Sequence, residues 1–142
     1  MKRGQILVEL LLALGVAMVV LTALAGVTTR SVFNSGFARR QSQASELALG
    51  GIEWVRSERN RLGWSYFSNY INGTYCMDTL DPTVWSTSGN SCTGVPVAGT
   101  TFIRRVDVSN PTGVGRTVKV TVDWTEGSHT YTARQTTILK GF

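Results

Sequence analysis

The sequence predicts an α+β protein in which one long N-terminal helix packs against a small antiparallel sheet of three strands. A helical pattern runs without a proline from about residue 6 to about residue 62. The composition becomes polar after Leu62, and residues 116–124 alternate between apolar and polar side chains as a strand does. With 142 residues, the chain has room for one domain of this kind and is too short for a large enzyme.

Residues 6–27 are the most apolar part of the chain. Glu9 is the only charged residue in this segment, and Thr22 is the only other polar one. At about 1.5 Å of rise per helical residue, the segment reaches about 33 Å, which is enough to cross the apolar core of a bilayer. One interpretation is a secretory signal peptide, with Lys2-Arg3 in front and cleavage after Ala25. Glu9 argues against it, because a charge inside the apolar region weakens insertion.

Residues 28–62 continue the helix and are predicted to be its amphipathic half. At 100° per residue, one stripe holds mostly apolar or small side chains. Its members are Phe33, Phe37, Ala44, Leu47, Ala48, Gly51, Val55 and Leu62. Glu46, Glu53 and Arg56 lie on the opposite side. Arg40 and Glu58 interrupt the stripe, and we expect each of them to have a partner.

Residues 63–100 are predicted to form an irregular connector at the start of a head that comprises residues 63–142. Cys76 and Cys92 are the two cysteines of the chain, and outside the cytoplasm they are expected to form a disulfide. Closing this loop contributes about 3 kcal/mol. The connector's aromatic residues are expected to pack it onto the helix rather than to form a stacking surface for a sugar or a base. They are Trp64, Tyr66, Phe67, Tyr70, Tyr75 and Trp85.

Residues 101–142 contain three strand signals, at 101–108, 116–124 and 130–139. A loop is predicted from Ser109 to Gly115, and a turn from Glu126 to His129. In the central strand, one face is predicted to cover the helix and the other to face solvent. The covering face holds Val118, Val120, Val122 and Trp124, and the other holds Thr117, Lys119, Thr121 and Asp123.

The sequence predicts no catalytic site, no metal site and no cofactor. His129 lies near Asp123 and Glu126, but all three fall in or beside one turn, and no nucleophile motif accompanies them. The formal net charge of +5 is ordinary for a surface domain. Four basic residues are expected on adjacent strands, either as a solvated face or as a weak strip for DNA. They are Arg104, Arg105, Arg116 and Lys119.

The run Gly4-Gln5-Ile6-Leu7-Val8-Glu9, followed by the long apolar helix, resembles the class III signal of type IV pilins and type II secretion pseudopilins. The resemblance implies a pilin-like fold. It implies that a prepilin peptidase cuts between Gly4 and Gln5, which removes residues 1–4 as a leader, and that it methylates Gln5. Residues 5–27 are then retained as the membrane and assembly half of the helix. Glu9 is implied to meet the N-terminal amine of a neighbouring subunit.

The same resemblance implies a structural subunit with several partners. These are other pilin subunits in a homo- or heteropolymer, the prepilin peptidase, an inner-membrane assembly platform and membrane lipid. The implied location is a single-pass membrane protein before assembly and an extracellular filament at the cell surface after it. The segments ELALGGIEWVRSERN and VKVTVDW are most similar to minor pilins and minor pseudopilins. The alternative is a secreted or membrane-anchored binding module with an ordinary signal peptide cut after Ala25.

Overall fold

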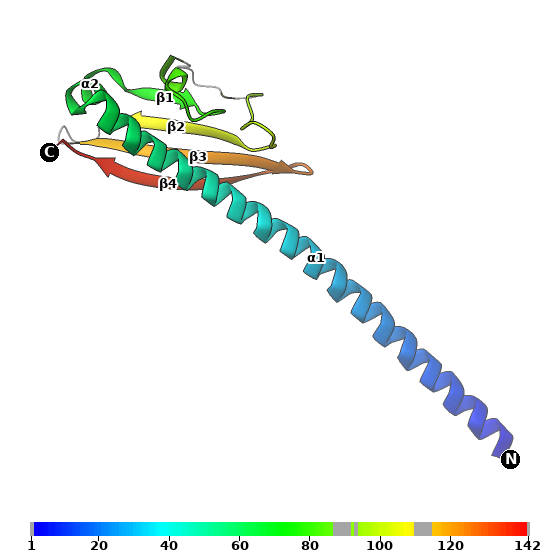
Figure 1. Cartoon of the computed structure of the whole chain (residues 1–142). Coiled ribbons are helices and arrows are strands. Elements are labelled where there is room, and N and C mark those ends of the chain that lie inside the picture. The colour runs from blue at the N-terminus through cyan, green and yellow to red at the C-terminus, as the bar shows by residue number, and fades with distance from the viewer. Residues whose placement is uncertain (1, 87–91, 93, 110–114, 142) are drawn as a thin grey trace. The chain divides into compact units, whose positions relative to one another are not determined.

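The computed structural model describes residues 2–86, 92, 94–109 and 115–141. Within them the elements are α1 (Lys2–Leu62), α2 (Trp64–Tyr70), β1 (Gly73–Cys76), η1 (Pro82–Ser86), β2 (Ile103–Ser109), β3 (Arg116–Glu126) and β4 (His129–Leu139) (Figure 1). The chain divides into two compact units, residues 1–40 and residues 41–142. The predicted end of the long helix at Leu62 is confirmed, whereas its beginning lies earlier than predicted, at Lys2.

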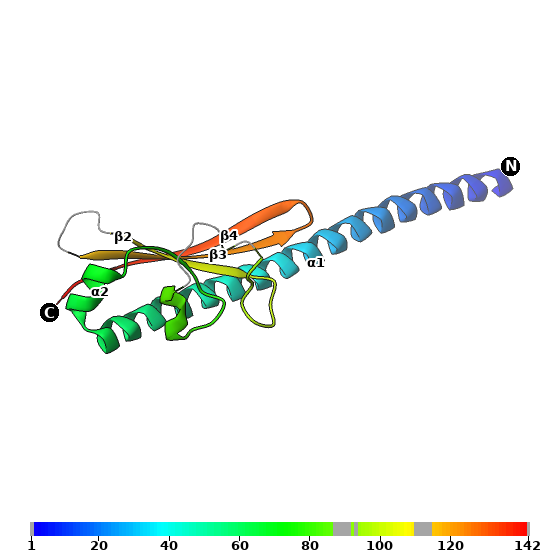
Figure 2. The ribbon, with the colours of Figure 1, turned by 90° about the horizontal axis from the view of Figure 1, so that it is seen from above.

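In residues 41–142, the end of α1 lies along one face of a sheet with strand order β1-β2-β3-β4 (Figures 1 and 2). Every neighbouring pair of strands is antiparallel. The predicted α+β class, with a helix packed on an antiparallel sheet, is therefore confirmed. The predicted loop between β2 and β3 falls on residues 110–114, which lie outside the described residues.

The sheet has four strands in the described residues, so the predicted number of three was wrong. The additional strand, β1, lies inside the segment predicted to be an irregular connector. It is four residues long, and it pairs with β2 from Gly73↔Val108 to Cys76↔Arg105. Thr74 Oγ1 also donates a hydrogen bond of 2.6 Å to Asp107 Oδ1 on β2. So short a strand has too few residues for an alternating pattern to stand out.

The core of this unit lies between α1 and the sheet. From α1 it takes the predicted stripe, with Ala44, Ala48 and Val55 fully buried, and Ile52 in addition. From β3 it takes the four predicted side chains, which are no more than 2% exposed: Val118, Val120, Val122 and Trp124. The N-terminal members of the stripe, Phe33 and Phe37, are exposed and belong to residues 1–40.

The connector is held to the core by its cysteines and aromatic rings. Cys76 and Cys92 form the predicted disulfide, with a distance of 5.4 Å between their Cα atoms. Trp85 on η1 stacks on Trp54 of α1 at 5.2 Å between ring centroids, and it meets Phe67 and Tyr75 edge to face. The prediction that the connector's aromatic residues pack onto the helix is confirmed for these rings. Tyr66 and Tyr70 instead stack on each other at the surface of α2.

Candidate functional site

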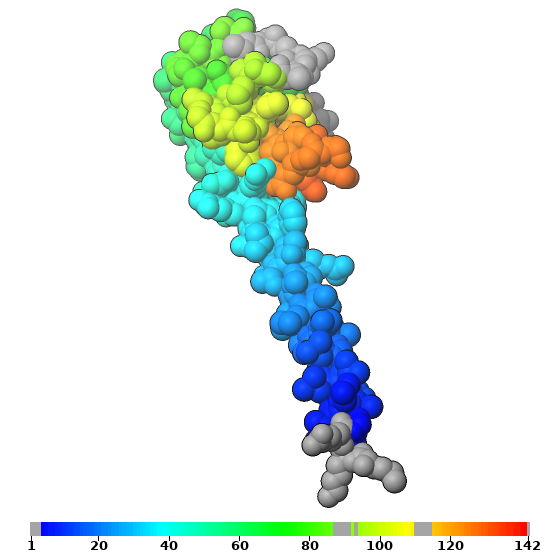
Figure 3. Space-filling model, turned by 90° about the vertical axis from the view of Figure 1, so that its right-hand side faces the viewer, coloured from blue at the N-terminus to red at the C-terminus, as the bar shows by residue number. Residues whose placement is uncertain are grey.

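The unit of residues 1–40 consists of the N-terminal part of α1. From Gly4 to Arg40 every residue is exposed, and Figure 3 shows side chains on all visible sides of this helix. Its most apolar window of 18 residues has a mean hydropathy of 2.6, and none of it is buried. By length and composition, the helix is able to cross a membrane.

The hydroxyl groups in this apolar helix bond to the helix itself. Thr22 Oγ1 donates to the carbonyls of Met18 at 3.0 Å and Val19 at 2.9 Å. Thr28 and Thr29 likewise donate to carbonyls four residues earlier in the chain, at 2.6 and 3.0 Å. Satisfied hydroxyls need no water, so these threonines are compatible with an apolar surrounding such as lipid.

Glu9 is the exception in this segment. Within the described residues, no basic side chain forms an ion pair with it. It lies four residues after Gln5, so the two side chains share one face of the helix with Val8 and Leu12. A carboxylate on an apolar helix costs about 2.5–3.5 kcal/mol at the centre of a bilayer, which a cation from another molecule would offset.

Within residues 6–27, two glycines leave the helix backbone without a covering side chain. A Cβ atom added at Gly15 or Gly26 would meet no other atom within 4 Å. Both positions therefore leave room for another helix to approach the backbone closely. They are also the positions in this segment with the weakest intrinsic helix propensity.

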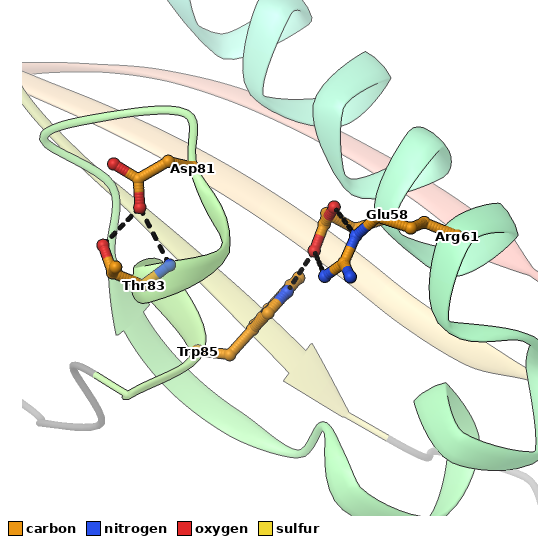
Figure 4. Close-up of polar contacts among 5 residues, drawn as sticks. All are labelled: Glu58, Arg61, Asp81, Thr83 and Trp85. Atoms are coloured by element: carbon orange, nitrogen blue, oxygen red, sulfur yellow. Dashed lines mark hydrogen bonds and ion pairs between the residues drawn. The ribbon is translucent and has the colours of Figure 1, made fainter.

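In residues 41–142, the predicted partner of Glu58 comes from two elements. Arg61 donates two hydrogen bonds of 2.7 Å to the Glu58 carboxylate, and Trp85 Nε1 donates a third of 3.0 Å (Figure 4). The Glu58 side chain is only 5% exposed. The cluster joins η1 to the end of α1. The sequence analysis named neither partner. The spacing of three residues on one helix could have indicated Arg61, but nothing in the sequence indicated Trp85, which lies 27 residues away.

The pKa of Glu58 lies below its ordinary value of 4.5. The hydrogen bonds from Arg61 are the main cause, burial acts in the opposite direction, and the Trp85 hydrogen bond and the Arg61 charge lower the pKa further. A carboxyl group with a lowered folded-state pKa contributes stability above its unfolded pKa. That contribution is lost as the pH falls through the folded-state pKa.

We therefore expect Glu58→Gln to lower the free energy of unfolding at neutral pH by about 1–2 kcal/mol. The variant should also lose less stability than the wild type when the pH falls below 4.5. Urea unfolding across the acid range, followed by tryptophan fluorescence, measures both effects. Glu53→Gln is the control, because Glu53 is 65% exposed in its 2.6 Å pair with Arg56 and should cost less than about 0.5 kcal/mol. Equal losses in the two variants would contradict the role of Glu58.

The predicted basic strip is wrong for Arg104. This residue is 3% exposed and lies under α1, where its Nε donates to Met77 O at 3.0 Å and its Nη1 to Leu47 O at 3.2 Å. Arg116 donates to the carbonyl of Ser68. The four basic residues therefore do not form one exposed strip, and such a strip no longer supports DNA binding.

The face of the sheet away from α1 carries paired charges. Arg105 lies 3.1 Å from Asp123, and Lys119 lies 3.0 Å from Asp107. Burial raises the pKa of Asp107, but the hydrogen bonds from Thr74 and Lys119, with nearby positive charge, outweigh it and lower the pKa.

Thr121, which was predicted to face solvent, is 1% exposed. Its register partners on β2 and β4 are Arg105 and Arg134. Long side chains at such flanking positions cover a short central one, which explains its burial.

The remaining candidates do not assemble into a reactive site. His129 is exposed at the β3–β4 turn, with its Nδ1 3.3 Å from Ser128 Oγ. Among the residues that the structure describes, no group of three or more His, Cys, Asp or Glu side chains is arranged to hold a metal ion. The feature with the clearest functional chemistry is thus the exposed apolar helix with Glu9.

No protein-family model, no curated protein and no solved structure matches this chain. Function is therefore inferred from the chain's own residues, chiefly Gly4, Gln5, Glu9 and the helix that carries them.

Proposed function

We propose that this protein is a structural subunit, a pilin or pseudopilin, that polymerises through its N-terminal helix into a filament of the type IV pilus kind. A prepilin peptidase cuts between Gly4 and Gln5, and residues 5–27 remain on the mature subunit. The protein is held in the membrane by this segment before assembly. It becomes part of an extracellular filament afterwards.

One observation carries the proposal: within the described residues, the carboxylate of Glu9 has no ion-pair partner, and it lies on an apolar helix whose side chains are exposed on every side. Among the exposed large apolar residues of this helix are Ile6, Leu7, Val8, Leu10, Leu11 and Leu12. A helix of this kind needs lipid or other helices around it. Glu9 also needs a cation to offset its charge. A filament meets both needs, because a bundle of identical helices buries the apolar surface and brings a cation to each Glu9.

The cation is the α-amino group that cleavage creates on Gln5. Gln5 and Glu9 are one helical turn apart on the same face, about 6 Å along the axis. A neighbouring subunit displaced along the filament axis therefore places its own amine opposite Glu9. The ion pair offsets the cost of the carboxylate and sets the axial register between the two helices. Methylation of Gln5 keeps the positive charge.

Cleavage requires a residue without a side chain next to the cut bond. Gly4 meets this requirement, since it leaves its backbone accessible to a narrow protease cleft. The resemblance to minor subunits includes a minor pilin or minor pseudopilin in the proposal, beside a major one. The alternative is a secreted or anchored module with cleavage after Ala25.

The test is the N-terminus of the mature protein, produced in a bacterial membrane together with a prepilin peptidase. Intact mass and sequencing of the first peptide distinguish the outcomes. A start at Gln5, with or without a methyl group, supports the proposal, and Gly4→Val should then abolish cleavage. A start at Gly26 would establish the ordinary signal peptide. An uncut chain that begins at Met1 would overturn prepilin processing.

A further inference from the structure

β4 forms one edge of the sheet and is eleven residues long. It pairs with β3 without a bulge, from Glu126↔His129 at the turn to Arg116↔Leu139. In an antiparallel ladder closed by a two-residue turn, the residues that bond to the partner strand alternate with residues that do not. On β4, the backbone groups that point away from β3 belong to Thr130, Thr132, Arg134, Thr136 and Ile138.

These backbone groups are open to solvent in the part of the chain that the structure describes. The side chains of all five residues are exposed, and no described backbone group bonds to them from outside the sheet. The turn that leads into β4 lies at the molecular surface (Figure 3). An extended chain that approaches this edge would find five N–H and C=O pairs in regular order.

Edge strands usually carry features that prevent such pairing, and β4 has few of them. Proline, a bulge, several charged residues or a short strand are the common devices. β4 has no proline and no bulge, and its single formally charged residue is Arg134. The opposite edge is different, because β1 has four residues and ends at the disulfide. The open edge is therefore specific to β4.

The C-terminal half of β4 is surrounded by positive charge. Arg134 and Lys140 are exposed on the strand and just after it. From α1, Arg56 Nη2 reaches Thr137 Oγ1 at 3.2 Å, and Arg59 Nη1 reaches Lys140 O at 2.8 Å. Arg56 and Arg59 lie on the α1 side of the sheet, where Glu53 pairs with Arg56. Arg134 lies on the other side, where Asp123 accepts a hydrogen bond from Thr132.

We propose that the β4 edge binds an extended acidic segment of another protein by strand addition. The backbone of that segment pairs with Arg134, Thr136 and Ile138, and the carboxylates on one of its faces meet the cations on that side of the sheet. A second copy of this chain does not fit the charge pattern. Acids on one face of a strand are two residues apart, and the nine acids of this chain are all at least three residues apart.

The test uses the full chain in micelles of a non-ionic detergent and a fluorescent peptide of about ten residues that alternates Glu and Thr, which is long enough to span the strand. We expect fluorescence anisotropy to show binding. Thr136→Pro should weaken it about tenfold or more, because proline removes an outward N–H without removing a bond to β3. Thr136→Ala, the matched control, keeps that N–H and should stay within about twofold. Arg134→Glu should weaken binding about tenfold.

Two further probes keep the test decisive if Thr136→Pro fails to fold. Two peptides carry N-methyl groups, one on every Glu and the other on every Thr, so that each has one blocked edge. The peptide whose blocked edge faces β4 should not bind. A peptide with Lys in place of Glu should bind at least about tenfold more weakly. The proposal would be overturned if the acidic peptide did not bind. It would also be overturned if both N-methylated peptides, or the lysine peptide, bound as tightly as the unmodified acidic peptide. A dimer of the chain that Thr136→Pro disrupts and the acidic peptide cannot displace would also overturn it.

Discussion

Gly51→Leu is expected to lower the free energy of unfolding of residues 41–142 by about 3 kcal/mol. A Cβ atom at residue 51 would lie 2.9 Å from Val120 Cγ1 and 3.5 Å from Arg104 Cδ. Neither neighbour moves easily. Val120 is fully buried in β3, and two hydrogen bonds hold Arg104 against the carbonyls of Met77 and Leu47. A larger side chain at residue 51 therefore forces α1 away from the sheet.

The adjacent glycine supplies a matched control. A Cβ atom at Gly50 would meet nothing within 4 Å, so Gly50→Leu should raise stability by about 0.5–1 kcal/mol through helix propensity alone. The four tryptophans all lie in residues 41–142, so urea unfolding followed by their fluorescence, in detergent, reports on this unit. Equal unfolding midpoints for the two leucine variants would show that α1 does not approach β3 as closely as described.

Glu9→Ala is expected to reduce incorporation into filaments at least about tenfold, if the proposed function is correct. The alanine removes the cost of a carboxylate in lipid, so the variant should insert into the membrane as well as the wild type does. What it loses is the attraction for the Gln5 amine of the next subunit. The readout is the ratio of subunit in sheared filaments to subunit in membranes, measured by immunoblot.

Glu46→Ala is the control for this experiment, because Glu46 is an exposed carboxylate on the same helix but lies outside the apolar segment. It should leave the ratio unchanged. The mature N-terminus of Glu9→Ala must also be measured. If that N-terminus is still Gln5, a low ratio reflects assembly and not processing. Normal incorporation of a processed Glu9→Ala subunit would refute the assembly role of Glu9.

Much of the fold could be predicted because its patterns are long. The apolar stripe of α1 repeats over several helical turns, and its side chains are buried from Ala44 to Val55. The alternation of β3 repeats over several residue pairs, and its apolar face is buried from Val118 to Trp124. β1 was missed because it is short, and because it is stabilised by β2 and the disulfide rather than by its own propensity.

The prediction for the basic residues failed for a different reason. Strand alternation states which residues share a face, but it does not state which face α1 covers at each strand. Arg104 lies on the same face of β2 as Val106 and Val108, and Arg105 lies on the other face, so Arg104 points to the core and is buried. The charge is tolerated because the Arg104 side chain donates to two backbone carbonyls.

The sequence by itself determined the features that depend on neighbours along the chain. These are the apolar helix with Glu9 one turn from Gln5, the amphipathic stripe and the strand pairs with a tight turn between them. Helical and strand periodicity follow from local backbone geometry, so they can be read from spacing. Only the tertiary structure decided that Trp85 binds Glu58, that Val120 packs against Gly51 and that β4 is an edge strand of the sheet. Each of these depends on segments that meet only after folding, and no local spacing records such a meeting.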